Sequence, residues 1–125
     1  MTKKVLLIDD DSEIQEVTQI AIRKIAGWET IAATTGAEGL SKARLEAPDA
    51  ILLDISMPDM DGFQVFEQLQ LDPLTQVIPV VLLTAKALPS DRRRFAAMKV
   101  AGVITKPFDP VTVWSQVEKF LGWSP

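Results

Sequence analysis

The sequence predicts a doubly wound α/β fold, in which a five-stranded parallel sheet is covered by five helices. Four short runs, residues 5–8, 50–53, 80–83 and 100–104, are almost entirely apolar, which is typical of parallel strands buried on both faces. The segments between these runs have apolar residues at helical spacing and begin with helix-capping residues. Because strands and helices alternate with short connections, residues 1–125 are expected to form one domain.

The first strand is expected to lead into a helix that begins at Ser12, with Gln15 completing a capping box. The apolar stripe of this helix is formed by Ile14, Val17, Ala21 and Ile25. A weaker strand over residues 29–33 follows, and the second helix begins with another capping box, Thr35 and Glu38.

The remaining elements follow the same alternation. After strand 50–53, Asp61 and Gln64 form the capping box of a third helix. After strand 80–83, a fourth helix is expected to begin at Ser90.

The last strand, residues 100–104, precedes a fifth helix. Asp109 is its expected N-cap and Pro110 the residue of its first turn. Its apolar stripe consists of Val113, Val117 and Leu121.

The composition excludes several classes of function. The chain has no histidine and no cysteine, which removes imidazole catalysis, thiol chemistry and the common zinc sites. A net charge of −4 spread along the chain argues against nucleic-acid binding, and the basic triplet at residues 92–94 reads as a solvated helix face. No apolar stretch approaches the roughly 20 residues of a membrane span, so a cytoplasmic protein without membrane insertion is expected.

Reactive polar side chains follow the predicted strands at their carboxyl ends: Asp9, Asp10, Asp54, Thr84 and Lys106. In open parallel sheets these ends form the ligand site, so the five side chains are expected to converge. Three carboxylates about 4 Å apart repel one another by several kcal/mol per pair, and Lys106 alone supplies too little positive charge. A hard cation with oxygen ligands, Mg²⁺ or Mn²⁺, suits this cluster.

The same residues suggest a chemistry. With a metal held by Asp10 and Asp54, and by Asp9 through water, Asp54 can attack a phosphoryl group and carry it as an acyl phosphate. Lys106 would add positive charge and Thr84 a hydroxyl donor. Taken alone, adjacent acids after a strand are more often charges that complement a helix dipole. The combination on several strands favours the metal site, and any phosphohistidine would have to come from another protein.

This set of residues resembles the receiver domain of two-component response regulators, of the stand-alone, CheY-like type. The match extends over nearly the whole chain and also includes Ala85, Pro107 and Phe108. The resemblance implies a flavodoxin-like sheet in the order 2-1-3-4-5, phosphorylation of Asp54 and a cis peptide bond between Lys106 and Pro107.

The resemblance also implies roles for neighbouring residues. The backbone carbonyl of Ser56 would bind the metal, and the side chains of Ser56 and Lys86 would border the phosphoryl group and tune its hydrolysis. Receivers usually carry Tyr or Phe three residues before the lysine, where this chain has Val103. Signal transfer would then rely on movement of Thr84 and the loop at residues 85–90 in place of an aromatic switch.

The resemblance implies two kinds of protein partner. A histidine kinase or a histidine phosphotransfer protein would donate the phosphoryl group. A downstream effector would bind the fourth helix, fifth strand and fifth helix, at a surface that includes Arg92, Arg93, Lys99, Val103 and Trp114. For Trp114, partial burial against the last helix is the alternative interpretation.

Three other functions remain open from the sequence. Val103 is compatible with a receiver-like adaptor that works without phosphorylation. A flavodoxin-like nucleotide binder would need a phosphate-cradling loop after the first strand, where residues 9–11 are all aspartate. An aspartate-based phosphatase usually carries its nucleophile at the end of the first strand. It also turns over external substrates, whereas a phosphoryl acceptor is not a turnover enzyme on external substrates.

Overall fold

The computed structural model describes residues 2–57, 60–85 and 88–123. Its strands form one sheet in the order β2-β1-β3-β4-β5, and every neighbouring pair is parallel. The bounds are β1 (Lys4–Ile8), β2 (Glu29–Ala33), β3 (Ala50–Asp54), β4 (Val80–Thr84) and β5 (Gly102–Thr105). The predicted fold class and strand order are confirmed.

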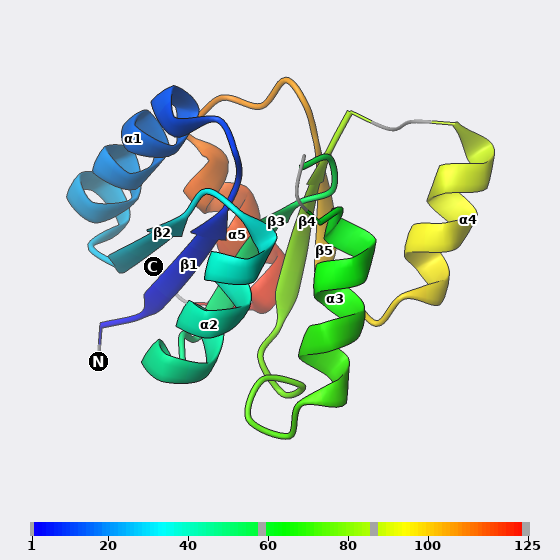
Figure 1. The fold of residues 1–125 in the computed structure, drawn as a ribbon. Coiled ribbons are helices and arrows are strands. Elements are labelled where there is room, and N and C mark those ends of the chain that lie inside the picture. The colour runs from blue at the N-terminus through cyan, green and yellow to red at the C-terminus, as the bar shows by residue number, and fades with distance from the viewer. Residues whose placement is uncertain (1, 58–59, 86–87, 124–125) are drawn as a thin grey trace.

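Helices cover the two faces of the sheet (Figure 1). Their bounds are α1 (Ser12–Ala21), α2 (Gly36–Glu46), α3 (Gly62–Leu71), α4 (Pro89–Ala97) and α5 (Val113–Leu121), and a π-helical segment, Ile22–Ala26, continues α1. Helices α2 and α3 lie in front of the sheet in Figure 1 and α5 lies behind it. None of the described helices is long and apolar enough to cross a membrane.

The sheet separates two apolar clusters. Leu6 and Ile8 of β1 point to the cluster that contains Phe63 and Phe66 of α3, together with Phe95 of α4. The alternate residues of β1 point to the other face, in a cluster with Trp28, Val113 and Val117. Because side chains alternate across a strand and both faces are covered, the strands need apolar residues at every position. This explains the unbroken apolar runs of the sequence.

Helix α1 differs from the prediction in its cap and its buried face. The N-cap is Asp11, whose Oδ1 accepts a hydrogen bond from the backbone N–H of Ile14 at 3.1 Å, in place of Ser12. Val17 and Ile25 of the predicted stripe are 45% and 53% exposed. The side of the helix and its π-helical continuation that faces the sheet consists of Gln15, Thr18, Ala21 and Ile22. The physical reason is the polar end of β1, which needs a hydrogen-bond donor from this face.

The later elements agree with the prediction except at their ends. The predicted caps Thr35 and Asp61 are confirmed, since each accepts from the backbone N–H three residues later. Helix α5 begins at Val113, because Asp109 instead closes the preceding turn, accepting from the N–H of Val111 at its Oδ1. The backbone N–H groups of Thr112 and Val113 also donate to the Asp109 carbonyl, at 3.1 and 2.9 Å.

The fourth helix begins one residue earlier than predicted, and the fifth strand is shorter than predicted. Helix α4 has Leu88 as its N-cap and ends at Ala97. Strand β5 begins at Gly102, two residues later than expected. The N–H of Ala101 already donates to the carbonyl of Val80 at 2.7 Å, so the chain is paired just before the regular strand begins.

Candidate functional site

Three carboxylates meet at the carboxyl end of the sheet. Asp9 and Asp10 follow β1, and Asp54 ends the neighbouring strand β3. One oxygen from each carboxylate lies within 4.8 Å of the others. Asp9 and Asp54 are only 3% and 2% exposed, whereas Asp10 is open to solvent. The sequence prediction that these acids converge is therefore correct.

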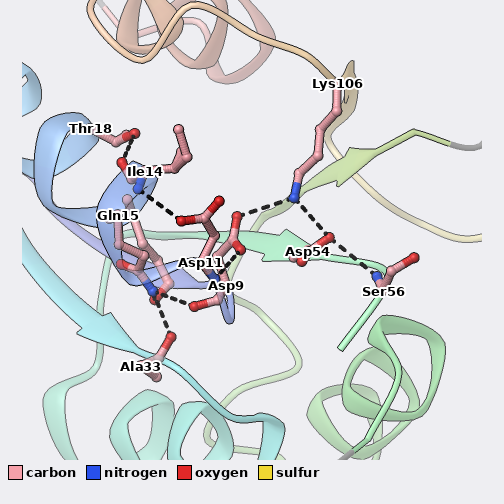
Figure 2. Close-up of polar contacts among 10 residues, drawn as sticks. Asp9, Asp11, Ile14, Gln15, Thr18, Ala33, Asp54, Ser56 and Lys106 are labelled. Atoms are coloured by element: carbon pink, nitrogen blue, oxygen red, sulfur yellow. Dashed lines mark hydrogen bonds and ion pairs between the residues drawn. The ribbon is translucent and has the colours of Figure 1, made fainter. Parts of the chain in front are cut away.

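Lys106 reaches the same carboxylates from the far side of the site. Its Nζ lies 3.2 Å from Oδ1 of Asp54 and 3.3 Å from Oδ2 of Asp9 (Figure 2). Strand β4 lies between β3 and β5, so the lysine crosses the end of β4, where its backbone N–H donates to the carbonyl of Thr84 at 2.7 Å. The peptide bond between Lys106 and Pro107 is cis, as expected.

Backbone N–H groups orient the two buried acids. The N–H of Ser56 donates to Oδ1 of Asp54 at 3.2 Å, and the N–H of Asp11 donates to Oδ1 of Asp9 at 3.0 Å. Both are contacts of an aspartate with the residue two positions later, a typical turn interaction. They hold each carboxylate against the chain that leaves its strand.

A close helix approach supports the end of β3. The first residue of α3, Gly62, donates its N–H to the carbonyl of Ile55 at 2.7 Å. A Cβ atom at this glycine would lie 2.6 Å from both the Asp54 carbonyl oxygen and the Ile55 Cα. Only glycine therefore allows α3 to begin this close to the site.

The burial of the acids changes their ionisation. Burial, together with the repulsion from Asp9, raises the pKa of Asp54 to about 6, although Lys106 and the Ser56 N–H oppose the shift. Burial disfavours the charged form of Lys106, but the attraction of Asp9 and Asp54 outweighs it, so the pKa of Lys106 lies above its ordinary value. The lysine is therefore charged at neutral pH. The charged form of Asp54 is disfavoured in the folded protein, and a further cation beside it would stabilise that form.

The donor set suits a hard divalent cation. The three side chains offer only carboxylate oxygens, which are the ligands that Mg²⁺ and Mn²⁺ prefer. Asp10 is exposed to solvent, so an ion bound here could also keep some of its water ligands. Two of the acids are buried, with the ammonium of Lys106 beside them. The residues present therefore fit such an ion.

The remaining predicted site residues are distributed around this centre. Thr84 is buried at the end of β4 and Ser56 is exposed. A cavity of about 330 Å³ is lined by Asp9, Asp11, Ile14, Ala85, Lys106, Pro107 and Phe108. The predicted tuning residue Lys86 lies outside the described residues. The cavity gives a reacting group access to Asp9 and Lys106 from one side.

The predicted partner residues do not form one patch. Arg93 and Lys99 are exposed, and Arg92 and Val103 line a hollow of about 460 Å³ between α4 and β5. Trp114 is half-buried and packs against the apolar cluster on the other face of the sheet. The structure thus brings Arg92 and Val103 together and leaves Trp114 apart from them.

Sequence reasoning missed one residue next to the site. Gln15 was assigned to a capping box, but its side chain is buried and donates to carbonyl oxygens at the ends of β1 and β2. The capping pattern fits the sequence equally well, so the letters alone do not distinguish the two roles.

Comparisons with known proteins agree with this geometry. Residues 5–118 match the model of the family described as the response regulator receiver domain. PilH of Pseudomonas aeruginosa is 34% identical over 93% of this chain and 96% of its own length. The chemotaxis protein CheY4 of Vibrio cholerae superposes with a TM-score of 0.86 at 28% identity, covering 96% of this chain and 99% of that one.

Some similar proteins are much longer. The alkaline phosphatase synthesis transcriptional regulatory protein PhoP of Bacillus subtilis is 36% identical over 97% of this chain, but the chain spans only 49% of its length. The shared part is thus the region that carries the acid cluster and the lysine.

Proposed function

Because the chain belongs to the response regulator receiver domain family, we propose that it accepts a phosphoryl group on Asp54 from a phosphohistidine of a partner protein. The donor would be a histidine kinase or a histidine phosphotransfer protein, since this chain has no histidine of its own. We further propose that the phosphorylated form of Asp54 is a signalling state and that the chain does not turn over external substrates. A cytoplasmic location is part of this proposal, because phosphohistidine is made from ATP inside the cell.

One observation carries the proposal: the ammonium of Lys106 lies within 3.3 Å of both buried carboxylates, Asp9 and Asp54. A structural ion pair needs one acid and one base, whereas this site holds an additional buried acid and the exposed Asp10 beside them. The excess of negative charge is what a metal-assisted phosphoryl-transfer site requires.

The contacts of Asp54 suggest which of its oxygens reacts. Lys106 and the Ser56 N–H both contact Oδ1, so among the described residues Oδ2 is left for the attack. In the proposed step, a bond forms between Oδ2 and phosphorus as the bond from phosphorus to the imidazole nitrogen breaks. The nitrogen keeps the electron pair, and the partner leaves with an unphosphorylated histidine.

A divalent cation, Mg²⁺ or Mn²⁺, would be held by Asp9, Asp10 and Asp54, with the carbonyl of Ser56 as a further ligand. When bound, it would neutralise the oxygens of the transferring phosphoryl group. Lys106 would stabilise the same charge from the opposite side, and Thr84 would offer its hydroxyl group. The buried position of Asp54 would limit the access of water to the acyl phosphate.

The proposal is tested with acetyl phosphate and Mg²⁺, followed by intact mass spectrometry. We expect the native protein to gain the mass of one phosphoryl group, and Asp54→Asn to gain none. Asp49→Asn is the matched control, because Asp49 precedes the same strand at its opposite end and bonds to the backbone of Lys4. No gain in the native protein, or an equal gain in Asp54→Asn, would overturn the proposal.

The signal would pass to an effector protein through the surface around α4 and β5. Its proposed residues are Arg92, Arg93, Lys99 and Val103, of which Arg92 and Val103 line the same hollow, whereas Trp114 packs on the other face of the sheet and is not part of this surface. The three exposed cations favour an acidic partner. Thr84 and Ala85, at the start of the loop before α4, and Pro107 after β5 would link the site to this surface.

A second candidate function is a receiver-like adaptor whose binding is independent of phosphorylation. It is favoured by Val103, which is half-buried at the hollow beside α4 and offers no aromatic ring to move. The adaptor interpretation predicts that an effector binds native protein and Asp54→Ala equally well, with or without phosphodonor. Binding that depends on the phosphodonor would exclude it.

A further inference from the structure

The side chain of Gln15 connects α1 to the ends of two strands. It is only 3% exposed, and its Nε2 lies 3.2 Å from the Leu7 carbonyl oxygen, 2.9 Å from that of Asp9 and 2.7 Å from that of Ala33. Figure 2 shows the Gln15 amide directed at Ala33 and at the backbone of Asp9. The amide nitrogen carries two hydrogens but has three carbonyl acceptors, so one of its hydrogens is shared between two of them.

The orientation of this amide follows from its surroundings. All three neighbouring groups are carbonyl oxygens, which only accept hydrogen bonds, so the nitrogen and not the oxygen must face them. No residue in the described part of the chain donates to the Oε1 of Gln15. The side chain is therefore held through its donors alone, and its interaction is with the strand ends.

These contacts converge on Asp9. The Ala33 carbonyl that accepts from Gln15 also accepts the backbone N–H of Asp9 at 3.1 Å. The Asp9 carbonyl itself accepts from Gln15, and because the peptide unit is planar, this contact sets the direction in which the chain enters Asp10. Gln15 thus touches the backbone on both sides of the first acid and orients the second.

We propose that Gln15 is a positioning residue for the divalent cation, holding the turn of Asp9 and Asp10 in the geometry that the ion requires. The inference rests on the function proposed above. Mg²⁺ demands near-octahedral coordination at about 2.0–2.1 Å, so a small rotation of the turn weakens binding. Groups that orient metal ligands typically change affinity about 10–100-fold when removed.

The test compares two substitutions on the same buried face of α1. Gln15→Met keeps the length and neutrality of the side chain but removes its donors. Thr18→Val is the matched control, because Thr18 is also buried and, among the described residues, its hydroxyl group donates only to the Ile14 carbonyl of its own helix. The affinity for Mn²⁺ is measured from the electron paramagnetic resonance of the free ion, and that for Mg²⁺ by competition, at a temperature where thermal denaturation shows each variant to be folded.

We expect roughly tenfold weaker binding of both ions in Gln15→Met and affinity within about twofold of native in Thr18→Val. If Gln15→Met does not fold, Gln15→Asn, which keeps the amide but shortens its reach, is compared in the same way. An affinity within about twofold of native in the Gln15 variant would overturn this inference alone, and so would an equal loss in Thr18→Val. A native protein that binds neither ion would overturn the proposed function together with it.

Discussion

The Nζ of Lys106 lies 3.2 Å from Oδ1 of Asp54, although strand β4 lies between the strands that carry the two residues to the site. The carboxylate is only 2% exposed, so water screens this contact little. The lysine also touches Asp9, and its charge is therefore shared between two acids that repel each other.

Removing the ammonium should slow the proposed phosphorylation. In Lys106→Met, we expect the rate with acetyl phosphate to fall about 10²-fold, the usual effect of losing one charge-stabilising donor. The pKa of Asp54 should also rise further above about 6, since Lys106 lowers it in the native protein. Mass spectrometry over time gives the rate. Lys99→Met, which changes an exposed lysine outside the site, should react at the native rate.

The stability of the metal-free protein should depend on the ionisation of Asp54. Its pKa is raised from 3.8 to about 6 in the folded state, so the folded protein binds more protons than the unfolded chain between these values. The contribution of Asp54 to the free energy of unfolding is fully present below about pH 4. It is lost as the pH rises through about 6, and the loss amounts to at most roughly 3 kcal/mol.

The substitution Asp54→Asn tests this dependence. In the presence of a chelator, urea denaturation at pH 7.5 should show the Asp54→Asn variant to be more stable than the native protein, and at pH 4.5 the difference should be much smaller. A stability difference that is equal at the two pH values would contradict the raised pKa.

Divalent cations should stabilise the folded protein through Asp10. At a Mg²⁺ concentration about 100 times the Kd, binding to the folded state adds about 2.7 kcal/mol to the free energy of unfolding. Asp10→Asn should lose most of this gain, because the exposed carboxylate is one of the three oxygen donors. Asp11→Asn is the control: asparagine is an equally good N-cap, and Asp11 lies outside the cluster. An equal Mg²⁺ effect in Asp10→Asn and native protein would contradict the assignment.

Two crowded glycines should differ in their tolerance of alanine. A Cβ at Gly62 would meet the backbone of Asp54 and Ile55 at 2.6 Å, whereas at Gly102 it would clash with the ring of Phe120. The backbone atoms beside Gly62 have little freedom to move, whereas the side chain of Phe120 is 42% exposed and can rotate away from Gly102. We expect Gly62→Ala to destabilise the protein by about 3 kcal/mol and Gly102→Ala by about 1 kcal/mol.

Urea denaturation of the two variants measures this difference. Phe120→Ala should remove most of the effect of Gly102→Ala, since the clash is with that ring. It should leave the effect of Gly62→Ala unchanged. The reverse order of the two single effects would show that the end of β3 adapts more easily than the structure indicates.

The strands and the acid cluster could be predicted from the sequence for a simple reason. Burial on both faces requires unbroken apolar runs, and the four apolar runs of this chain coincide with β1, β3, β4 and β5 to within two residues. Parallel strands deliver their carboxyl ends to one edge, so Asp9, Asp10 and Asp54 had to lie near one another once the fold class was known. The caps Thr35 and Asp61 depend only on residues three positions away, and these too were predicted correctly.

Only the tertiary structure decided which side of a helix faces the sheet and how the site is braced. The apolar spacing of α1 favoured Val17 and Ile25, yet the polar Gln15 is buried because carbonyl oxygens at the ends of β1 and β2 need a donor. These carbonyl oxygens come from strands that are separated in the sequence, so a local sequence pattern does not reveal that they face Gln15. The same holds for the distance between Lys106 and Asp54 and for the raised pKa of Asp54. The sequence by itself determined the charged residues and the alternation of strands and helices, and its resemblance to receiver domains implied the strand order. Desolvation and contact geometry exist only after the chain has folded.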